Sequence, residues 1–269
     1  MPALRILTPT VNFTRRVFAI SPHLDDAALS VGATLADFAV RGADVEVLTL
    51  FAGAPHEPLS EVARVFHVKC GLPTDAAAIA LRREEDQAAM HELGAHAHHR
   101  EFLDAIYRRT PDGQWLCRHD QAMFDAQPLD QDLLDEVSRE VRHVLHTVAP
   151  DLVLTCTAVG NHIDHQLTRA AILHAITGTE MRLLLWEDLP YAVGRPPPTT
   201  PHIISLIPAK AWEQKRCAIT RYTTQVHMLW SADTDWPAQL LAHANTRGHG
   251  HPAELLLTPD ALLAPVPTG

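Results

Sequence analysis

The chain has few of the features that mark secreted, membrane or nucleic-acid-binding proteins. Its four cysteines, at positions 70, 117, 156 and 217, include no pair at two-residue spacing, which excludes a zinc ribbon or a redox dithiol motif. No apolar run is long enough to span a bilayer, and the N-terminal segment lacks the apolar core of a signal peptide. Lys and Arg number 22 against 32 Asp and Glu, a formal net charge of −10. We therefore expect a cytoplasmic protein with reduced thiols, no stable membrane insertion and no nucleic-acid partner.

The rest of the composition is that of an ordinary globular domain. Of the 269 residues, 46% are hydrophobic and 20% are charged, which fits one domain over residues 1–269. We expect residues 1–15 and 258–269 to be peripheral extensions of that domain. The sequence leaves open whether copies of the chain associate into a homo-oligomer.

Apolar segments alternate between strand-like and helix-like patterns along the chain. We expect strands at 17–21, 45–51, 100–103, 152–156, 181–186 and 202–207. We expect helices at 26–40, 75–93, 129–148, 166–177 and 209–222, with a short helix inside 53–72. The histidines at 96, 98 and 99 are expected in a polar connection. This alternation predicts an α/β fold, a Rossmann-like, mostly parallel sheet with helices on both faces.

Polar side chains follow several of the expected strands. The run Ser21-Pro22-His23-Leu24-Asp25-Asp26 follows the first strand, and Asn161-His162-Ile163-Asp164-His165 follows the strand at 152–156. Asp104 and the pair Glu187-Asp188 follow two others. Because ligands of such folds bind beyond the carboxyl ends of the strands, we expect these side chains to converge on one rim.

Within the two clusters lie the donors of a hydrolytic metal site. Zinc in such a site takes about three protein ligands and keeps one position open. His23 and Asp26 lie three residues apart across a strand-to-helix turn, so both can face one point. His165 would supply the third ligand. The resulting His-Asp-His set suits zinc and tolerates other divalent metals.

Three further side chains of the clusters could carry the chemistry. Asp25 would act as general base toward metal-bound water, whose pKa falls to about 7 on binding. His162 would stabilise an oxyanion or protonate a leaving amine, with Asp164 holding its imidazole in position. Considered one at a time, Asp25, Asp26 or Asp164 would be helix caps. Capping does not account for the histidines around these carboxylates, nor for a second cluster after another strand.

These residues resemble the PIG-L/LmbE-like N-deacetylases. The run Ser-Pro-His-Leu-Asp-Asp-Ala is similar to that family's Pro-His-Pro-Asp-Asp segment, and positions 162, 164 and 165 match its His-x-Asp-His motif. Other matching positions are Arg82-Arg83-Glu84-Glu85, Leu93-Gly94, Phe102-Leu103-Asp104, Lys215, Ala218, Tyr222, Gln225, Arg247-Gly248 and Glu254. The resemblance covers residues 16–257.

By this resemblance, the protein is a zinc-dependent enzyme that removes the acetyl group from an N-acetylglucosamine moiety. The site residues that it implies are His23, Asp26 and His165 as metal ligands, Asp25, His162 and Asp164 as catalytic residues, and Arg82 and Asp104 as substrate-binding residues. For Arg82 the simpler interpretation is a salt bridge with Glu85 or Asp86 on an exposed helix.

Departures from the family pattern place the chain in a subgroup. Leu24 replaces the commoner Pro, Ala27 stands where many members have Glu, and Ser30 and Ala33 replace a pair of glycines. With residues 186–192, this variant resembles deacetylases of glycopeptide-antibiotic pseudoaglycones of the teicoplanin type, whose partner is a small N-acetylated glycoconjugate. The alternatives are a deacetylase of a mycothiol- or bacillithiol-type thiol-cofactor precursor, a metal hydrolase of another amide bond, and a non-catalytic Rossmann-like module that binds a sugar or nucleotide. The missing Gly-x-Gly-x-x-Gly run weakens the nucleotide version of the last.

Overall fold

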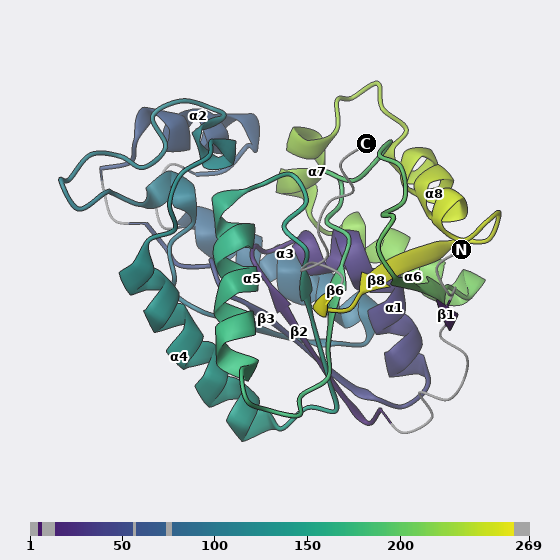
Figure 1. Cartoon of the computed structure of the whole chain (residues 1–269). Coiled ribbons are helices and arrows are strands. Elements are labelled where there is room, and N and C mark those ends of the chain that lie inside the picture. Colours follow the sequence, from purple (N-terminus) through teal and green to yellow (C-terminus); the bar gives the residue numbers. More distant parts are fainter. Residues whose placement is uncertain (1–4, 7–13, 56–57, 74–76, 261–269) are drawn as a thin grey trace.

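A central sheet runs through the computed structural model, which describes residues 5–6, 14–55, 58–73 and 77–260 (Figure 1). The strands described are β1 (Arg5–Ile6), β2 (Arg16–Ser21), β3 (Asp44–Thr49), β4 (His96–His99), β5 (Leu152–Cys156), β6 (Leu183–Trp186), β7 (His202–Leu206) and β8 (Ala253–Leu257). Their order in the sheet is β1-β7-β8-β6-β5-β2-β3-β4. All neighbours are parallel except β8, which is antiparallel to both β6 and β7. The predicted α/β class with a mostly parallel sheet is confirmed.

Helices cover both faces of this sheet. The α-helices described are α1 (Asp26–Val40), α2 (Glu61–Lys69), α3 (Ala77–Leu93), α4 (Gln131–Val148), α5 (Ile163–Ile176), α6 (Ala209–Ile219), α7 (Thr223–Leu229) and α8 (Trp236–Arg247), with short 3₁₀ turns η1 (Ala105–Tyr107) and η2 (Ala122–Phe124). Helices α4 and α5 pack on one face, and α1, α3 and α6 on the other, each over its own apolar core (Figure 1). Strand β5 is buried along its whole length, as expected for a parallel strand covered on both sides.

Local sequence explains where the main helices begin and end. Helix α1 has the predicted bounds. Helix α4 begins after Asp130, whose Oδ1 accepts the Leu133 N–H at 3.1 Å, and it ends at Ala149, with a φ of 47°, directly before Pro150. Helix α3 ends before Gly94, whose φ of 72° suits the predicted glycine stop.

The direction of the chain through the sheet changes at β2. From β2 the chain continues to β3 and β4 on one side, whereas β5 and β6 lie on the other side. Open α/β sheets bind ligands beyond the carboxyl ends of the strands at such a switch point. Ile20 and Thr155 are in register, so the segments that follow Ser21 and Cys156 leave the sheet side by side. The fold therefore brings the two polar clusters to one place.

Some expected elements differ from the structure. The strand expected at 100–103 lies at 96–99, so the three histidines belong to β4 and not to a loop. Strand β4 is at the edge of the sheet, where half-exposed polar side chains are tolerated and the apolar pattern is weak. The sequence did not indicate α7 and α8 as separate helices or β8 as a strand. In the expected extension 1–15, residues 5–6 pair with β7, whereas residues 1–4 and 7–13 lie outside the described residues.

A buried ion pair ties α1 to the C-terminal strand. Lys215 Nζ lies 2.6 Å from Glu254 Oε1, and both side chains are almost fully buried. Lys215 also donates to the Ser30 carbonyl at 3.4 Å, while Glu254 Oε2 accepts the Thr34 N–H at 2.8 Å. In a regular α-helix those two backbone groups bond to each other. The ion pair thus bridges one turn of α1.

We expect Lys215→Met to lower the free energy of unfolding by about 3–5 kcal/mol, because it leaves the Glu254 charge buried without its partner. Arg216→Met removes the exposed partner of Glu213 on the same helix and should change stability far less, because water and salt screen an exposed ion pair. Denaturant unfolding followed by circular dichroism measures both. Equal losses in the two variants would contradict the importance of burial here.

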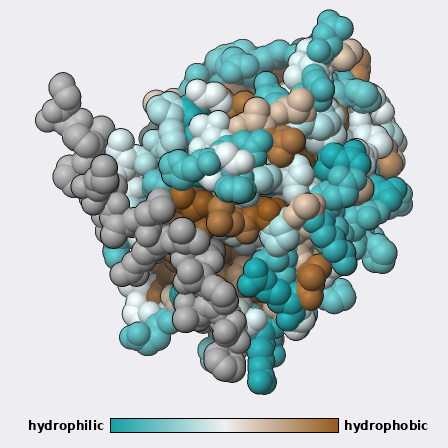
Figure 2. Space-filling view, turned by 90° about the vertical axis from the view of Figure 1, so that its right-hand side faces the viewer, coloured by the Kyte–Doolittle hydropathy of each residue, from teal (hydrophilic) through white to brown (hydrophobic). Residues whose placement is uncertain are grey.

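The surface is mostly hydrophilic on the face shown in Figure 2, with a band of hydrophobic residues near its centre. Among the described residues, the exposed large hydrophobic side chains lie on five elements: Val40, Val68, Leu206, Met228 and Leu241. Single exposed apolar side chains are normal on globular proteins. No helix in the described part of the chain is both long and apolar enough to cross a membrane.

Candidate active site and metal centre

The turn after β2 places two carboxylates and an imidazole at the carboxyl edge of the sheet. Asp26 is the first residue of α1, and its Oδ2 accepts the backbone N–H of His23 at 2.8 Å, which closes the turn. Asp25 occupies the N-cap position, yet its side chain makes no capping hydrogen bond. The carboxylate of Asp25 instead lines a cavity. Capping therefore does not explain Asp25.

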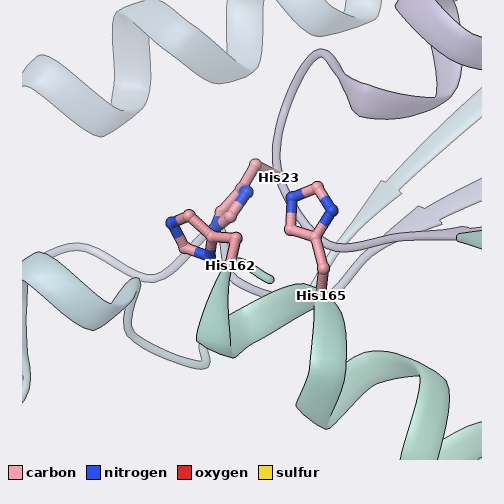
Figure 3. A group of neighbouring side chains, drawn as sticks. All are labelled: His23, His162 and His165. Carbon is pink, nitrogen blue, oxygen red and sulfur yellow. The ribbon is translucent and has the colours of Figure 1, made fainter. Parts of the chain in front are cut away.

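The second cluster opens helix α5. His162 is the N-cap residue, and its Nδ1 accepts the backbone N–H of Asp164 at 3.2 Å. The preceding loop needs Gly160, because its φ is 98° and a Cβ there would lie 2.7 Å from the ring of Tyr191. Figure 3 shows the rings of His162 and His165, both from the start of α5, gathered against the ring of His23 from the turn after β2.

Asp26 lies between two of these imidazoles. Its Oδ2 is 3.1 Å from His23 Nδ1 and 3.3 Å from His165 Nε2, and the latter nitrogen is buried without a hydrogen-bond partner. The outer nitrogens face other carboxylates: His23 Nε2 is 3.1 Å from Asp164 Oδ2, and His165 Nδ1 is 2.8 Å from Asp188 Oδ1. Metal-binding histidines typically turn one nitrogen to the metal and the other to a carboxylate.

These donors fit a divalent cation. Two imidazole nitrogens and one carboxylate oxygen, all buried, match the ligand types of zinc and of related divalent metals. The fold thus brings together His23, Asp26 and His165, the expected ligands. His162 lies beside them, with one nitrogen of each of the three histidines within 4.8 Å of the others.

The pKa values of the ionisable groups in the cluster are shifted in different directions. Burial raises the pKa of Asp25 to about 6, and the neighbouring Asp26 adds to this rise. For Asp26 burial acts in the same direction, but the cations of His165 and His23 outweigh it and hold its pKa well below the usual value. Burial and the charge of His23 keep the pKa of His162 well below its usual value, so this imidazole is neutral.

The carboxylate of Asp164 contacts groups other than His162, its expected partner. It accepts the Ala105 N–H at 2.9 Å, pairs with Arg108 and contacts His23, whereas only the backbone N–H of Asp164 reaches His162. The reason is helical geometry, since side chains two residues apart do not face each other. Sequence reasoning missed Arg108, which lies in an irregular stretch without a motif.

The two predicted substrate-binding residues both line the cavity. Arg82 of α3 is 4% exposed, and its Nε has no hydrogen-bond partner. Its two expected salt-bridge partners bind elsewhere: Glu85 accepts the Thr224 N–H at 2.9 Å, and Asp86 accepts the Tyr222 hydroxyl at 2.7 Å. The simpler interpretation of Arg82 therefore does not hold. Asp104 caps η1 through Oδ1, and its Oδ2 lies 3.6 Å from His23 Nε2.

The side chains of Glu187 and Asp188, which follow β6, point to opposite sides of the sheet edge. Asp188 reaches His165, a role that its position after a strand indicated only in general terms. Glu187 was expected on the same rim, but its carboxylate turns away and binds Arg247 and His243 of α8. Consecutive residues at the end of a strand point in opposite directions, which separates the two carboxylates.

Comparison with known proteins identifies the family of the chain. Residues 18–176 match PIG-L, described as GlcNAc-PI de-N-acetylase. The chain belongs to the PIG-L family. It is 30% identical over 197 residues to the 2'-N-acetylparomamine deacetylase of Niallia circulans, covering 67% of this chain and 70% of that enzyme. The predicted family is thereby confirmed, and this PIG-L protein is a deacetylase rather than a non-catalytic module.

Solved structures resemble this PIG-L deacetylase over nearly its whole length. The zinc-inhibited form of teicoplanin deacetylase Orf2 is 38% identical with a TM-score of 0.81, covering 91% of this chain and 99% of that chain. The A40926 pseudoaglycone deacetylase Dbv21 is 35% identical with a TM-score of 0.78, covering 91% and 97%. The expected similarity to teicoplanin-type pseudoaglycone deacetylases is confirmed.

The cavity of this PIG-L deacetylase has a volume of about 370 Å³. The polar side chains that line it include His23, Asp25, Asp26, Arg82, Asp104 and His162. An apolar wall is formed by side chains that include Val62, Val65 and Phe66 of α2, Phe124 of η2, and Met228 and Leu229 of α7. Lys69, Asp120, Gln121 and Gln225 also line the cavity. Pockets of this size hold small molecules, and a few convergent polar groups fix the ligand's orientation.

Proposed function

We propose that this protein removes the acetyl group from an N-acetylglucosaminyl moiety of a glycopeptide-antibiotic pseudoaglycone. The reaction would depend on a divalent metal, and zinc is the metal that we propose. One observation carries the proposal. His23 and Asp26 line the same cavity as the carboxylate of Asp25, which makes no capping hydrogen bond, and the buried His165 lies directly against Asp26. A metal site with an adjacent carboxylate is suited to hydrolysis of an amide.

The metal ligands would be His23, Asp26 and His165. A divalent ion bound there supplies Lewis-acid polarisation of the acetamide carbonyl and acidifies water. Asp25 accepts the proton of the attacking water and passes it to the nitrogen of the leaving sugar amine. The C–N bond breaks, and the products are acetate and the free amine. A carboxylate with a raised pKa, such as Asp25, is suited to both proton transfers.

His162 stabilises the oxyanion in this proposal. Its Nδ1 accepts the backbone N–H of Asp164, so the proton of the neutral ring is on Nε2. An Nε2–H can donate a hydrogen bond to negative charge that develops on the carbonyl oxygen. A neutral imidazole has no additional proton to give to the amine. Of the two roles considered for His162, the contact with Asp164 therefore favours stabilisation over acid catalysis.

Arg82 and Asp104 would bind the hydroxyl groups of the sugar. The guanidinium of Arg82 supplies donors, and Asp104 Oδ2 supplies an acceptor on the same cavity wall. A sugar hydroxyl can both donate and accept. The buried, unpartnered Nε of Arg82 shows that this side chain is not saturated by the protein itself.

The apolar wall favours a substrate with an apolar aglycone. Phe66, Phe124 and Met228 would bury little apolar surface against paromamine, because its rings carry hydroxyl and amino groups throughout. An aromatic peptide aglycone would bury apolar surface against these side chains. The teicoplanin and A40926 deacetylases are also 38% and 35% identical to this chain, against 30% for the paromamine enzyme. The four unpaired cysteines suit a cytoplasmic location, which is part of the same proposal.

We expect acetate release from an N-acetylglucosaminyl glycopeptide pseudoaglycone that stops on chelation and returns when zinc is added back. 2'-N-Acetylparomamine and N-acetylglucosaminyl inositol, the latter a thiol-cofactor precursor, should be cleaved at least about 10-fold less efficiently in kcat/KM, because they lack apolar groups for the wall. Mass spectrometry of the sugar product measures all three. Preference for the inositol compound would support the thiol-cofactor alternative, and chelator-resistant turnover would contradict the metal.

A further inference from the structure

The carboxylate of Asp188 holds the proposed metal ligand His165 from outside the segment 18–176 that matches the family. Its Oδ1 lies 2.8 Å from His165 Nδ1. Its Oδ2 accepts hydrogen bonds from Thr157 Oγ1 at 2.6 Å and from the Val159 N–H at 3.0 Å. Asp188 is 1% exposed. The carboxylate cannot rotate without breaking one of these contacts.

The residues on either side of Asp188 are fixed as well. Glu187 Oε1 and Oε2 accept hydrogen bonds from Arg247 Nη2 at 2.6 Å and Nε at 2.9 Å, a buried two-point ion pair with α8. The Leu189 N–H donates to Ser30 Oγ at 3.1 Å, which attaches the same segment to α1. The segment that carries Asp188 is therefore held between the first and the last helix of the described chain.

We propose that Asp188 is a positioning residue for the metal site, and that the Glu187–Arg247 ion pair holds it in place. A neutral imidazole has one protonated nitrogen, and a carboxylate acceptor at Nδ1 keeps the proton there. When a metal displaces the second proton of the ring, the lone pair on His165 Nε2, which lies 3.3 Å from Asp26 Oδ2, is available to that metal. This inference rests on the metal-dependent function proposed above, and it makes metal affinity depend on α8.

The variant Asp188→Asn preserves the size of the side chain and tests this role. If its amide nitrogen faces His165, it donates to Nδ1 and moves the ring proton to Nε2, which can then no longer bind a metal. If the amide is flipped, its nitrogen meets the Val159 N–H, and two donors face each other. Both orientations weaken the site.

The decisive measurement is the zinc affinity of the full chain, by competition with a chromogenic chelator. We expect Asp188→Asn to bind zinc about 10–100-fold more weakly than the wild type. The visible spectrum of the Co²⁺-loaded variant should also change, because it reports ligand geometry. Asp151→Asn is the matched control: Asp151 accepts the N–H groups of Arg15 and Arg16 at 2.7 and 2.9 Å, outside the cavity lining. Its zinc affinity and cobalt spectrum should equal those of the wild type.

Two further variants keep the proposal testable if Asp188→Asn does not fold. Thr157→Val removes one hydrogen bond to Asp188, and Arg247→Met removes the ion pair with Glu187. Each should weaken zinc binding several-fold, and Arg247→Lys should recover part of the loss. Folded Asp188→Asn with wild-type zinc affinity and cobalt spectrum would overturn the proposal, as would unchanged affinity in both further variants. A wild-type chain that binds no zinc would overturn the proposed function together with it.

Discussion

Asp25→Asn should lower kcat by about 10²–10⁴-fold, the range that a positioned general base supplies. The amide of Asn cannot accept the proton of the attacking water. The fold and the zinc content should remain, because Asp25 makes no capping hydrogen bond and is not among the proposed ligands. Steady-state release of acetate, with zinc quantified on the same sample, measures both quantities.

Asp37→Asn is the matched control for this variant. It makes the same exchange of carboxylate for amide on the same helix, where Asp37 pairs with Arg41 on the outside. Its kcat should equal that of the wild type. Full activity of Asp25→Asn would remove Asp25 from the mechanism, whereas loss of zinc from this variant would make Asp25 a ligand rather than a base.

His162→Asn should lower kcat by about 10²–10³-fold with little change in KM, the loss expected for one oxyanion donor. Asn was chosen because it is a good N-cap residue and can still accept the Asp164 N–H that opens α5. The shorter side chain does not carry a donor to the position of Nε2. Activity, KM and zinc content together measure the effect.

The control for His162→Asn is His174→Asn, the same exchange at an exposed position near the end of α5. It should leave activity unchanged. A loss of zinc from His162→Asn would contradict the oxyanion role and place His162 among the ligands. This outcome must be tested, because the ring of His162 lies close to those of His23 and His165. A rise in KM with an unchanged kcat would indicate a role in binding alone.

Local patterns in the sequence were sufficient for the centre of the fold and for the polar part of the site. Val17–Ser21 and the helix from Asp26 could be predicted because an apolar run and helical spacing adjoin a short polar turn. That turn and the start of α5 follow parallel strands, so their convergence follows from topology alone.

What the sequence could not indicate depends on remote contacts. The side-chain partners Arg108 and Asp188 are defined only by where a distant loop and the end of β6 come to lie. Strand β8 inserts between two earlier strands, and no local signal gives that position. The orientation of the Asp164 side chain, by contrast, could be predicted, because the two-residue spacing from His162 excludes a face-to-face contact in a helix.

The bridge between Lys215 and Glu254 has a consequence for the order in which the protein is completed. Ribosomes make α1 early, but the acceptor of its Thr34 N–H is on β8, which is made more than two hundred residues later. Strand β8 also lies between β6 and β7. A nascent chain that stops short of β8 therefore has every proposed metal ligand and still lacks the support of the helix that carries Asp26. Newly made chains gain the complete site only after β8 has been made.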